Sequence, residues 1–141
     1  METLVLLKPD TLKRGLVGRV LTRLEDRGIR FLRVKELIML PRHCEELYAK
    51  FKGEPYLPRI QEFMTSGPIE ARVAHAPHAP DDTITIVRSA VGSFTAPAAG
   101  TIRGDFGAVR EKNLIHASDS PSAAKVEIEI FFPGFPGDVG D

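Results

Sequence analysis

The sequence predicts one α+β domain in which helices lie over one face of a four-stranded antiparallel sheet. The chain has 141 residues, of which 43% are hydrophobic, so it has the size of a single domain and can build its own core. Short apolar runs alternate along the chain with segments of helical periodicity. Residues 92–113 interrupt this alternation with a long irregular segment that contains a proline and several glycines.

In the first half of the chain, strands and helices alternate. The predicted elements are a strand over residues 3–7, a helix over 16–24, a strand over 29–40, a helix over 42–51 and one or two helical turns over 60–64. Lys8-Pro9-Asp10 ends the first strand, because proline cannot donate to a strand ladder. Gly28 is a typical helix stop, and Pro41 closes the second strand.

The second half is predicted as a strand over 69–74, a loop over 76–82, a helix over 83–91, the irregular segment, a helical turn over 120–125 and a strand over 128–132. In residues 83–91 the β-branched side chains favour a strand, but apolar residues recur at helical spacing, and we interpret the segment as a helix. A compact domain rarely keeps more than about 20 irregular residues unless they serve a site. The order of elements is that of a ferredoxin-like (βαββαβ) sandwich.

Composition excludes several classes of protein. The 19 basic and 19 acidic residues cancel, so the chain lacks the positive excess typical of nucleic-acid-binding domains. Its one cysteine, Cys44, excludes an internal disulfide framework and fits a reducing compartment. No run approaches about 18 apolar residues, and Met1-Glu2-Thr3 does not begin a signal peptide. We therefore expect a soluble cytoplasmic protein that binds neither membranes nor nucleic acid.

His116 is the first candidate for chemistry. It lies in Asn113-Leu114-Ile115-His116-Ala117-Ser118-Asp119-Ser120, which combines an amide, an imidazole, hydroxyls and a carboxylate. A neutral imidazole is a competent nucleophile near pH 7, because its ordinary pKa of about 6.5 leaves most of it unprotonated. Alternatively, Ser118, Asp119 or Ser120 caps a helix and His116 has no chemical role. Both interpretations can hold, since a helix N-terminus also offers N–H groups to an anion.

Three cations form a second candidate set. Lys8 follows the first strand, Arg88 lies in the predicted helix 83–91, and Arg103 lies among glycines in residues 100–107. Guanidinium groups suit bidentate contacts with phosphate, although each of these charges taken alone is more typical of a solvated surface. The phosphate-binding pattern G-x-x-x-x-G-K-[ST] is absent.

Aromatic and metal-ligating side chains give weaker signals. Tyr48 and Tyr56 flank a helix–loop segment and can either stack on a planar ligand or pack in the core. The pairs His43-Cys44 and His75/His78 lack further ligands at recognised spacing, so we predict no protein-ligated metal site.

Taken together, three segments resemble the signature segments of the nucleoside diphosphate kinase family. They are residues 5–10 followed by 14–18, residues 100–107, and residues 113–120, and residues 65–68 also match. The resemblance runs from about Met1 to Phe132, so we take residues 1–132 as the domain and 133–141 as a Gly/Pro-rich tail that we expect to be loosely held.

The resemblance implies an enzyme that moves the γ-phosphoryl group of a nucleoside triphosphate to a nucleoside diphosphate by a ping-pong mechanism, through a phosphohistidine, and so maintains (d)NTP pools. His116 is then the nucleophile, Glu127 the carboxylate that orients its ring, and Ser118 a neighbour of both. Mg²⁺ is implied as cofactor, held mainly by nucleotide phosphates and water. A homo-oligomer is also implied.

The remaining matched positions are implied to contact the nucleotide or to lie beside the nucleophile. They are Lys8, Arg88, Arg103 and Asn113 at the phosphates and ribose, Tyr48 near the nucleophile, and Tyr56 and Ile60 beside the base. Tyr56 stands where the family usually has phenylalanine. A base held by stacking explains why the family accepts many bases.

The sequence departs from the family at residues 92–100. The usual Gly-x-Thr-x-Pro is replaced by Gly92-Ser93-Phe94-Thr95-Ala96-Pro97, and the chain is shorter than the family pattern before Gly100. Counting back from Pro97 selects Thr95 as the phosphate-contacting residue, whereas counting from Gly92 selects Phe94. We take Thr95, and we expect assembly or nucleotide preference to differ from the common pattern.

Overall fold

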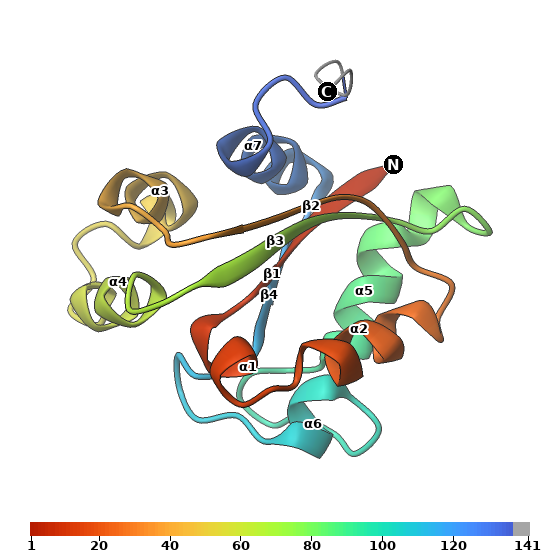
Figure 1. The fold of residues 1–141 in the computed structure, drawn as a ribbon, viewed down its shortest axis with the longest axis horizontal. Coiled ribbons are helices and arrows are strands. Elements are labelled where there is room, and N and C mark those ends of the chain that lie inside the picture. The colour runs from red at the N-terminus through yellow and green to blue at the C-terminus, as the bar shows by residue number, and fades with distance from the viewer. Residues whose placement is uncertain (137–141) are drawn as a thin grey trace.

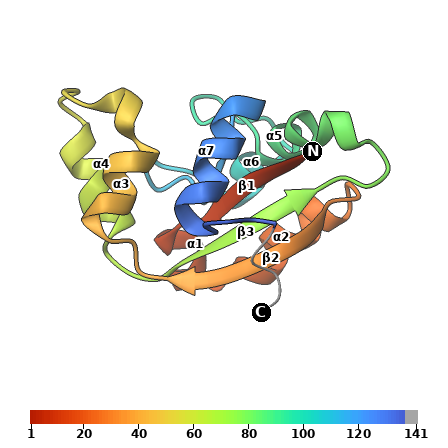
Figure 2. The same cartoon turned by 90° about the horizontal axis from the view of Figure 1, so that it is seen from above.

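The computed structural model describes residues 1–136, in which a four-stranded antiparallel sheet lies between two layers of helices (Figures 1 and 2). The strands are β1 (Glu2–Leu7), β2 (Arg30–Leu37), β3 (Ile69–His75) and β4 (Ile115–Ala117), in the spatial order β2-β3-β1-β4. The helices are α1 (Pro9–Lys13), α2 (Val17–Glu25), α3 (Pro41–Leu47), α4 (Leu57–Met64), α5 (Thr83–Val91), α6 (Ile102–Phe106) and α7 (Pro121–Phe131), with 3-10 turns η1 (Ala49–Phe51) and η2 (Pro80–Asp82). The predicted α+β, ferredoxin-like class is confirmed.

β1 is the central strand that organises the sheet. It pairs antiparallel with β3 along its whole length, and its last three residues pair with β4. In that second pairing Leu6 lies opposite His116. Residues 3–7 are fully buried, which explains why the strand reads as a continuous apolar run.

Alternate residues of β1 enter two separate cores. Val5 and Leu7 pack on one face of the sheet with apolar residues of α2 and α5. Leu4 and Leu6 pack on the other face with apolar residues from α3 and α7. Helices therefore cover both faces, and the prediction that they cover one face was wrong. A strand that is apolar on both sides needs cover on both sides.

The predicted strand over 128–132 was also wrong, because residues 128–131 belong to α7 and Phe132 is the C-cap of that helix. Ala124, Ile128 and Phe131 recur at helical spacing and face the core, and Ser120 caps the helix by accepting the N–H of Ala123 at 3.1 Å. The fourth strand is instead the three-residue β4, which precedes this helix.

Two short helices lie where none was predicted. α1 begins directly after β1 with Pro9 at its first position, where the missing N–H costs no hydrogen bond. α6 lies inside the irregular segment, and Thr101 caps it by accepting the N–H of Gly104 at 3.0 Å. Residues 83–91 form a helix, as predicted.

The C-terminal stretch is only partly described. Phe135 packs against the core that contains α7, so the start of the predicted tail contacts the domain. Residues 137–141 lie outside the described part of the chain. Within residues 1–136, no helix has the length and apolar character needed to span a bilayer.

The helical assignment of residues 121–131 makes a stability prediction. Phe131 is 1% exposed and is the largest fully buried side chain, whereas Val126 of the same helix is 60% exposed. We expect Phe131→Ala to lower the free energy of unfolding by about 3–5 kcal/mol, and Val126→Ala to change it by less than about 0.5 kcal/mol. Urea unfolding followed by circular dichroism measures both. Equal effects of the two substitutions would contradict the helical packing.

Candidate active site

His116 lies at the middle of β4 and meets a carboxylate from α7. Its Nε2 is 2.8 Å from Oε1 of Glu127, and both side chains are mostly buried. Ser118 donates a hydrogen bond to the same oxygen at 2.7 Å. Because an ionised carboxylate only accepts hydrogen bonds, Nε2 carries the proton. Nδ1 is then unprotonated, and its lone pair is available for nucleophilic attack.

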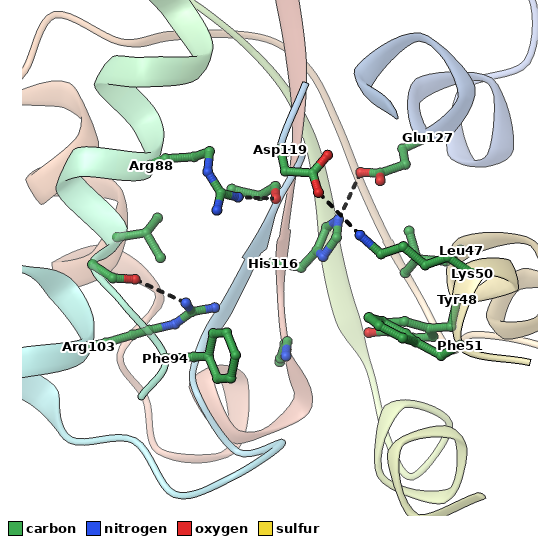
Figure 3. Close-up of a pocket in the computed structure, with 14 residues that line it drawn as sticks. Leu47, Tyr48, Lys50, Phe51, Arg88, Phe94, Arg103, His116, Asp119 and Glu127 are labelled. Atoms are coloured by element: carbon green, nitrogen blue, oxygen red, sulfur yellow. Dashed lines mark hydrogen bonds and ion pairs between the residues drawn. The ribbon is translucent and has the colours of Figure 1, made fainter. Parts of the chain in front are cut away.

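The free side of the His116 ring faces a cavity of about 220 Å³ (Figure 3). The cavity lies between the β1/β4 pair, α5, α7 and the segment that ends α3. The residues that line it are Lys8, Leu47, Tyr48, Lys50, Phe51, Arg88, Val91, Gly92, Phe94, Arg103, His116, Ala117, Asp119 and Glu127.

Lys8 is a buried cation at the carboxyl end of β1. Its Nζ donates to Oδ1 of Asn113 at 2.7 Å and to the carbonyl of Glu111 at 3.4 Å. Burial, and to a smaller extent the nearby Arg103, lower the pKa of its ammonium to about 8, while Asp10 and Glu111 oppose the shift. Asn113 does not itself line the cavity, but it fixes the position of Lys8.

Arg103 is held rigidly by backbone carbonyls. Its guanidinium donates to the carbonyls of Gly92 at 3.0 Å, Asn113 at 3.0 Å and Ile115 at 2.6 Å, and to Oδ1 of Asn113 at 3.3 Å. Burial and the nearby Arg88 lower its pKa to about 10. Arg88 makes one such bond, to the carbonyl of Ala117 at 3.2 Å, so most of its N–H groups are available to a ligand (Figure 3).

Aromatic side chains form the opposite wall of the cavity. Tyr48 is buried, burial raises its pKa, and its hydroxyl has no hydrogen-bond partner within the described residues. Phe51 packs against Tyr48, with ring centroids 6.2 Å apart, and Tyr56 meets Phe51 edge-on at 5.8 Å. Tyr56 and Ile60 do not line the cavity themselves, but Tyr56 extends its aromatic wall.

The chain matches the family model described as nucleoside diphosphate kinase over residues 1–136. The chain belongs to the nucleoside diphosphate kinase family. A nucleoside diphosphate kinase of Thermoplasma acidophilum is 45% identical over 133 residues, covering 93% of this chain and 87% of that protein. One from Methanococcus maripaludis is also 45% identical, covering 93% of this chain and 97% of that protein.

Solved structures of the family share the fold. The nucleoside diphosphate kinase of Encephalitozoon cuniculi superposes with a TM-score of 0.88 at 32% identity, covering 94% of this chain and 88% of that one. The halophilic nucleoside diphosphate kinase of Halobacterium salinarum, solved in complex with CDP, gives 0.86 at 36% identity, covering 94% and 87%. These relatives are phosphotransferases, and this chain carries the same family framework.

The structure brings most of the residues matched to the nucleoside diphosphate kinase signature to one cavity. Lys8, Tyr48, Arg88, Arg103, His116 and Glu127 line it, and Asn113 and Ser118 hold lining residues in place. In residues 113–120 the predicted helix cap is confirmed at Ser120, and His116 faces the cavity.

Thr95, like Tyr56 and Ile60, is a matched residue that does not line the cavity. Its hydroxyl lies 3.1 Å from that of Ser93, and its backbone N–H donates to the same oxygen at 3.2 Å. Phe94 lines the cavity instead and is 67% exposed. The geometry therefore favours Phe94, the position counted from Gly92, as the residue that reaches the site.

Several lining residues were missed from the sequence. Leu47 and Phe51 lie on the same side of the segment as Tyr48, so the helical periodicity there contained the signal. Lys50 forms an ion pair with Asp119 at 3.1 Å across the edge of the cavity (Figure 3). Such an exposed pair contributes about 0–1 kcal/mol, so a ligand can separate it easily. No sequence pattern links the two residues.

Buried Lys8 makes the stability of the domain depend on pH. Its pKa is about 8 in the folded chain and 10.5 as an ordinary lysine, so the unfolded chain binds more protons between these values. Its contribution to stability therefore rises with pH from about 8 to 10.5 and is lost as pH falls through 8. We take the difference in unfolding free energy, parent chain minus Lys8→Met. This difference should rise with pH across the window, by at most about 1.4 kcal/mol per pH unit. Urea unfolding across the window measures it, and a constant difference would refute it.

Proposed function

We propose that this chain is a nucleoside diphosphate kinase in which His116 carries the phosphoryl group between two nucleotides. One observation supports this above the others: His116 has one nitrogen bonded to Glu127 and the other facing a cavity lined by Lys8, Arg88 and Arg103. A nucleophile that faces several fixed cations suits the transfer of a highly charged phosphoryl group.

In the first half-reaction, Nδ1 of His116 attacks the γ-phosphorus of a nucleoside triphosphate. The N–P bond forms as the bond from phosphorus to the β–γ bridging oxygen breaks, and a nucleoside diphosphate leaves. In the second, a terminal β-phosphate oxygen of another nucleoside diphosphate attacks the phosphorus, the N–P bond breaks, and the free imidazole returns. Glu127 accepts the Nε2–H throughout and stabilises the positive charge on the phosphorylated ring.

The cations act by position and charge, since the protein forms few covalent bonds to the transferred group. Arg88 keeps most of its N–H groups free for phosphate oxygens. Lys8 is held by Asn113, and Arg103 by its carbonyl acceptors, so both charges are in place before the nucleotide binds. The unpartnered hydroxyl of Tyr48 supplies a further donor beside the nucleophile.

We propose that the nucleoside lies along the aromatic wall, with its base beside Tyr56 and Ile60. The edge-on contact of Tyr56 with Phe51 supports this, because it continues the wall outward from the phosphate end of the cavity. Stacking is tolerant of base identity. The related Halobacterium salinarum enzyme was solved in complex with CDP.

We propose Mg²⁺ as the cofactor, bound mainly by nucleotide phosphates and water. Within residues 1–136 no group of three or more His, Cys, Asp or Glu side chains is arranged to hold a metal ion. Glu127 already accepts two hydrogen bonds, which leaves Asp119 at the cavity edge as a carboxylate that can reach the ion directly or through water. This donor set fits an ion that keeps several waters. Bound Mg²⁺ neutralises charge on the phosphates.

We further propose a cytoplasmic homo-oligomer that assembles through β2, and no role in binding nucleic acid or membranes. β2 is one of the two edge strands of the sheet, so the backbone groups of its outer side are available to a second copy. Leu32 and Val34 of β2 are exposed apolar side chains, and Ile38 and Leu40 continue this row just after the strand. Such a row is typical of a covered surface. The balanced charge gives no support for nucleic-acid binding.

The central proposal is tested by incubating the protein with Mg²⁺ and ATP labelled on the γ-phosphate. We expect label on the protein that is stable in base and labile in acid, and that a nucleoside diphosphate removes. His116→Ala should abolish both labelling and nucleotide exchange while the circular dichroism spectrum is unchanged. Labelled His116→Ala protein would reject this residue as the nucleophile. A parent chain that binds nucleotide without labelling would instead be a non-catalytic binding protein.

The assembly proposal is tested by charge substitution on β2. We expect the parent chain to sediment as an oligomer, and the double variant Val34→Lys, Ile38→Lys to sediment as a monomer, because burying two ammonium groups opposes pairing. Val126→Lys introduces the same charge at an exposed apolar position of α7 and should leave the oligomer intact. An unchanged sedimentation coefficient in the double variant would exclude β2 as the interface.

A further inference from the structure

Leu114 has a strained backbone two residues before His116. Its φ is +78°, in the left-handed region that non-glycine residues rarely adopt, and its side chain is fully buried. This conformation is unfavourable for a residue with a Cβ. Strain of this kind persists where the surrounding structure enforces it, and it concentrates at functional sites.

Three groups at the start of α1 hold the Leu114 backbone. The Leu114 N–H donates to Oδ2 of Asp10 at 3.1 Å. Its carbonyl accepts the backbone N–H of Lys8 at 2.9 Å and the hydroxyl of Thr11 at 2.5 Å. Both polar groups of the residue are therefore bonded to one turn of chain that follows β1. The Asp10 carboxylate is the acceptor for the N–H.

The residues on either side of Leu114 belong to the site. Asn113 accepts hydrogen bonds from Lys8 and Arg103, and Ile115 begins the strand that carries His116. A rotation of the Leu114 backbone would move Asn113 and His116 relative to each other. The contact with Asp10 therefore controls the geometry between the cation cluster and the nucleophile.

The surroundings of Asp10 do not favour the stability of the fold. It is largely buried, and its second oxygen, Oδ1, has no hydrogen-bond partner within residues 1–136. A half-satisfied buried carboxylate is unfavourable for folding. Burial accordingly raises the pKa of Asp10, against the effect of its backbone hydrogen bonds and of Lys8 and Arg14. A cost of this kind beside a catalytic centre indicates a functional role.

We propose that Asp10 is a positioning residue of the phosphoryl-transfer site, which holds the left-handed Leu114 so that Asn113 and His116 keep their places, and which puts a negative charge two residues from the buried Lys8. The inference rests on the proposed function. Asp10 touches no reacting atom in this scheme and acts through Leu114 and Lys8.

The second role follows from the charges that face Lys8. Asp10 on α1 and Glu111 before β4 are the acidic groups that favour its protonated form, and Arg103 on α6 opposes it. Arg88, Tyr48 and His116 line the same cavity from α5, the α3 end and β4. Removal of the Asp10 charge therefore lowers the pKa of Lys8. As pH rises, Lys8 then loses its proton, and the site its positive charge, at a lower pH than in the parent chain.

Three variants separate these roles. Asp10→Ala removes both the acceptor for Leu114 and the charge. Asp10→Asn keeps an oxygen acceptor in the same place but removes the charge. Asp26→Asn removes a charge from an exposed residue just after α2 and serves as the matched control. Two measurements are made on each full-length protein: the single-turnover rate of His116 phosphorylation by ATP as a function of pH, and hydrogen exchange at the Leu114 amide.

We expect Asp10→Ala to slow phosphorylation about 10- to 100-fold at neutral pH and to speed exchange at Leu114. Asp10→Asn should phosphorylate near the parent rate at neutral pH, with its alkaline decline displaced to lower pH. Asp26→Asn should match the parent in both measurements.

An Asp10→Asn pH profile that coincides with that of the parent would overturn the charge role, and parent-like phosphorylation by Asp10→Ala would overturn the positioning role. If Asp10→Ala does not fold, Asp10→Asn still tests the proposal. Phosphorylation of Asp10→Asn that is slowed at every pH counts against the proposal, and so does a pH profile that coincides with that of the parent. A parent chain that is never phosphorylated would refute the proposed function, whereas faster exchange at Leu114 in Asp10→Ala would still support the contact.

Discussion

The site depends on the short pairing between β1 and β4. Three residue pairs join these strands, and Leu6 lies opposite His116. The same pairing continues beyond β4, where the N–H of Ser118 donates to the carbonyl of Leu4 at 3.2 Å. Because β1 is buried on both faces and paired on both edges, it cannot shift without disrupting both cores. This rigid strand fixes His116, which we propose as the nucleophile, as well as Ser118, which bonds to Glu127, and Lys8 at its own end.

Burial of positive charge is the second feature that the chemistry uses. Burial lowers the pKa of both Lys8 and Arg103, which means that the ligand-free protein holds these charges at a cost. Backbone carbonyls fix Arg103, so the charge does not reorient when phosphate arrives. In the proposed reaction, the polyphosphate of the nucleotide supplies the compensating negative charge. In the proposed reaction, cations that are already fixed in place stabilise the transferred phosphoryl group, and their side chains do not have to move during the transfer.

How much of this could be predicted varies along the chain, for physical reasons. The apolar run of β1 and the helical spacing of α2 are strong local signals, and the structure confirms them. Residues 83–91 gave mixed signals, and their interpretation as a helix is also confirmed. β4 has only three residues with a histidine at its centre, and its stability comes from pairing with β1, which local sequence does not report. Residues 128–132 were wrongly predicted as a strand because short apolar runs of β-branched and aromatic residues fit either structure. The resemblance to the family motifs identified His116, Glu127 and the cations as candidate site residues. The Lys50–Asp119 ion pair could not be predicted in this way, because it joins distant segments of the chain.

The segment 92–100 shows why spacing alone could not assign every site residue. The Thr95 hydroxyl and N–H both bond to Ser93, so this turn satisfies the polar groups that a phosphate would otherwise contact. The same turn directs Phe94 into the cavity, beside Arg103 and across from Phe51 (Figure 3). A phenyl ring offers phosphate no hydrogen bond, but it displaces water, and cations act more strongly in a drier site. In the proposed reaction, Phe94 offers the phosphate no hydroxyl, and Arg88, which keeps most of its N–H groups free, is the principal donor to the transferred phosphate.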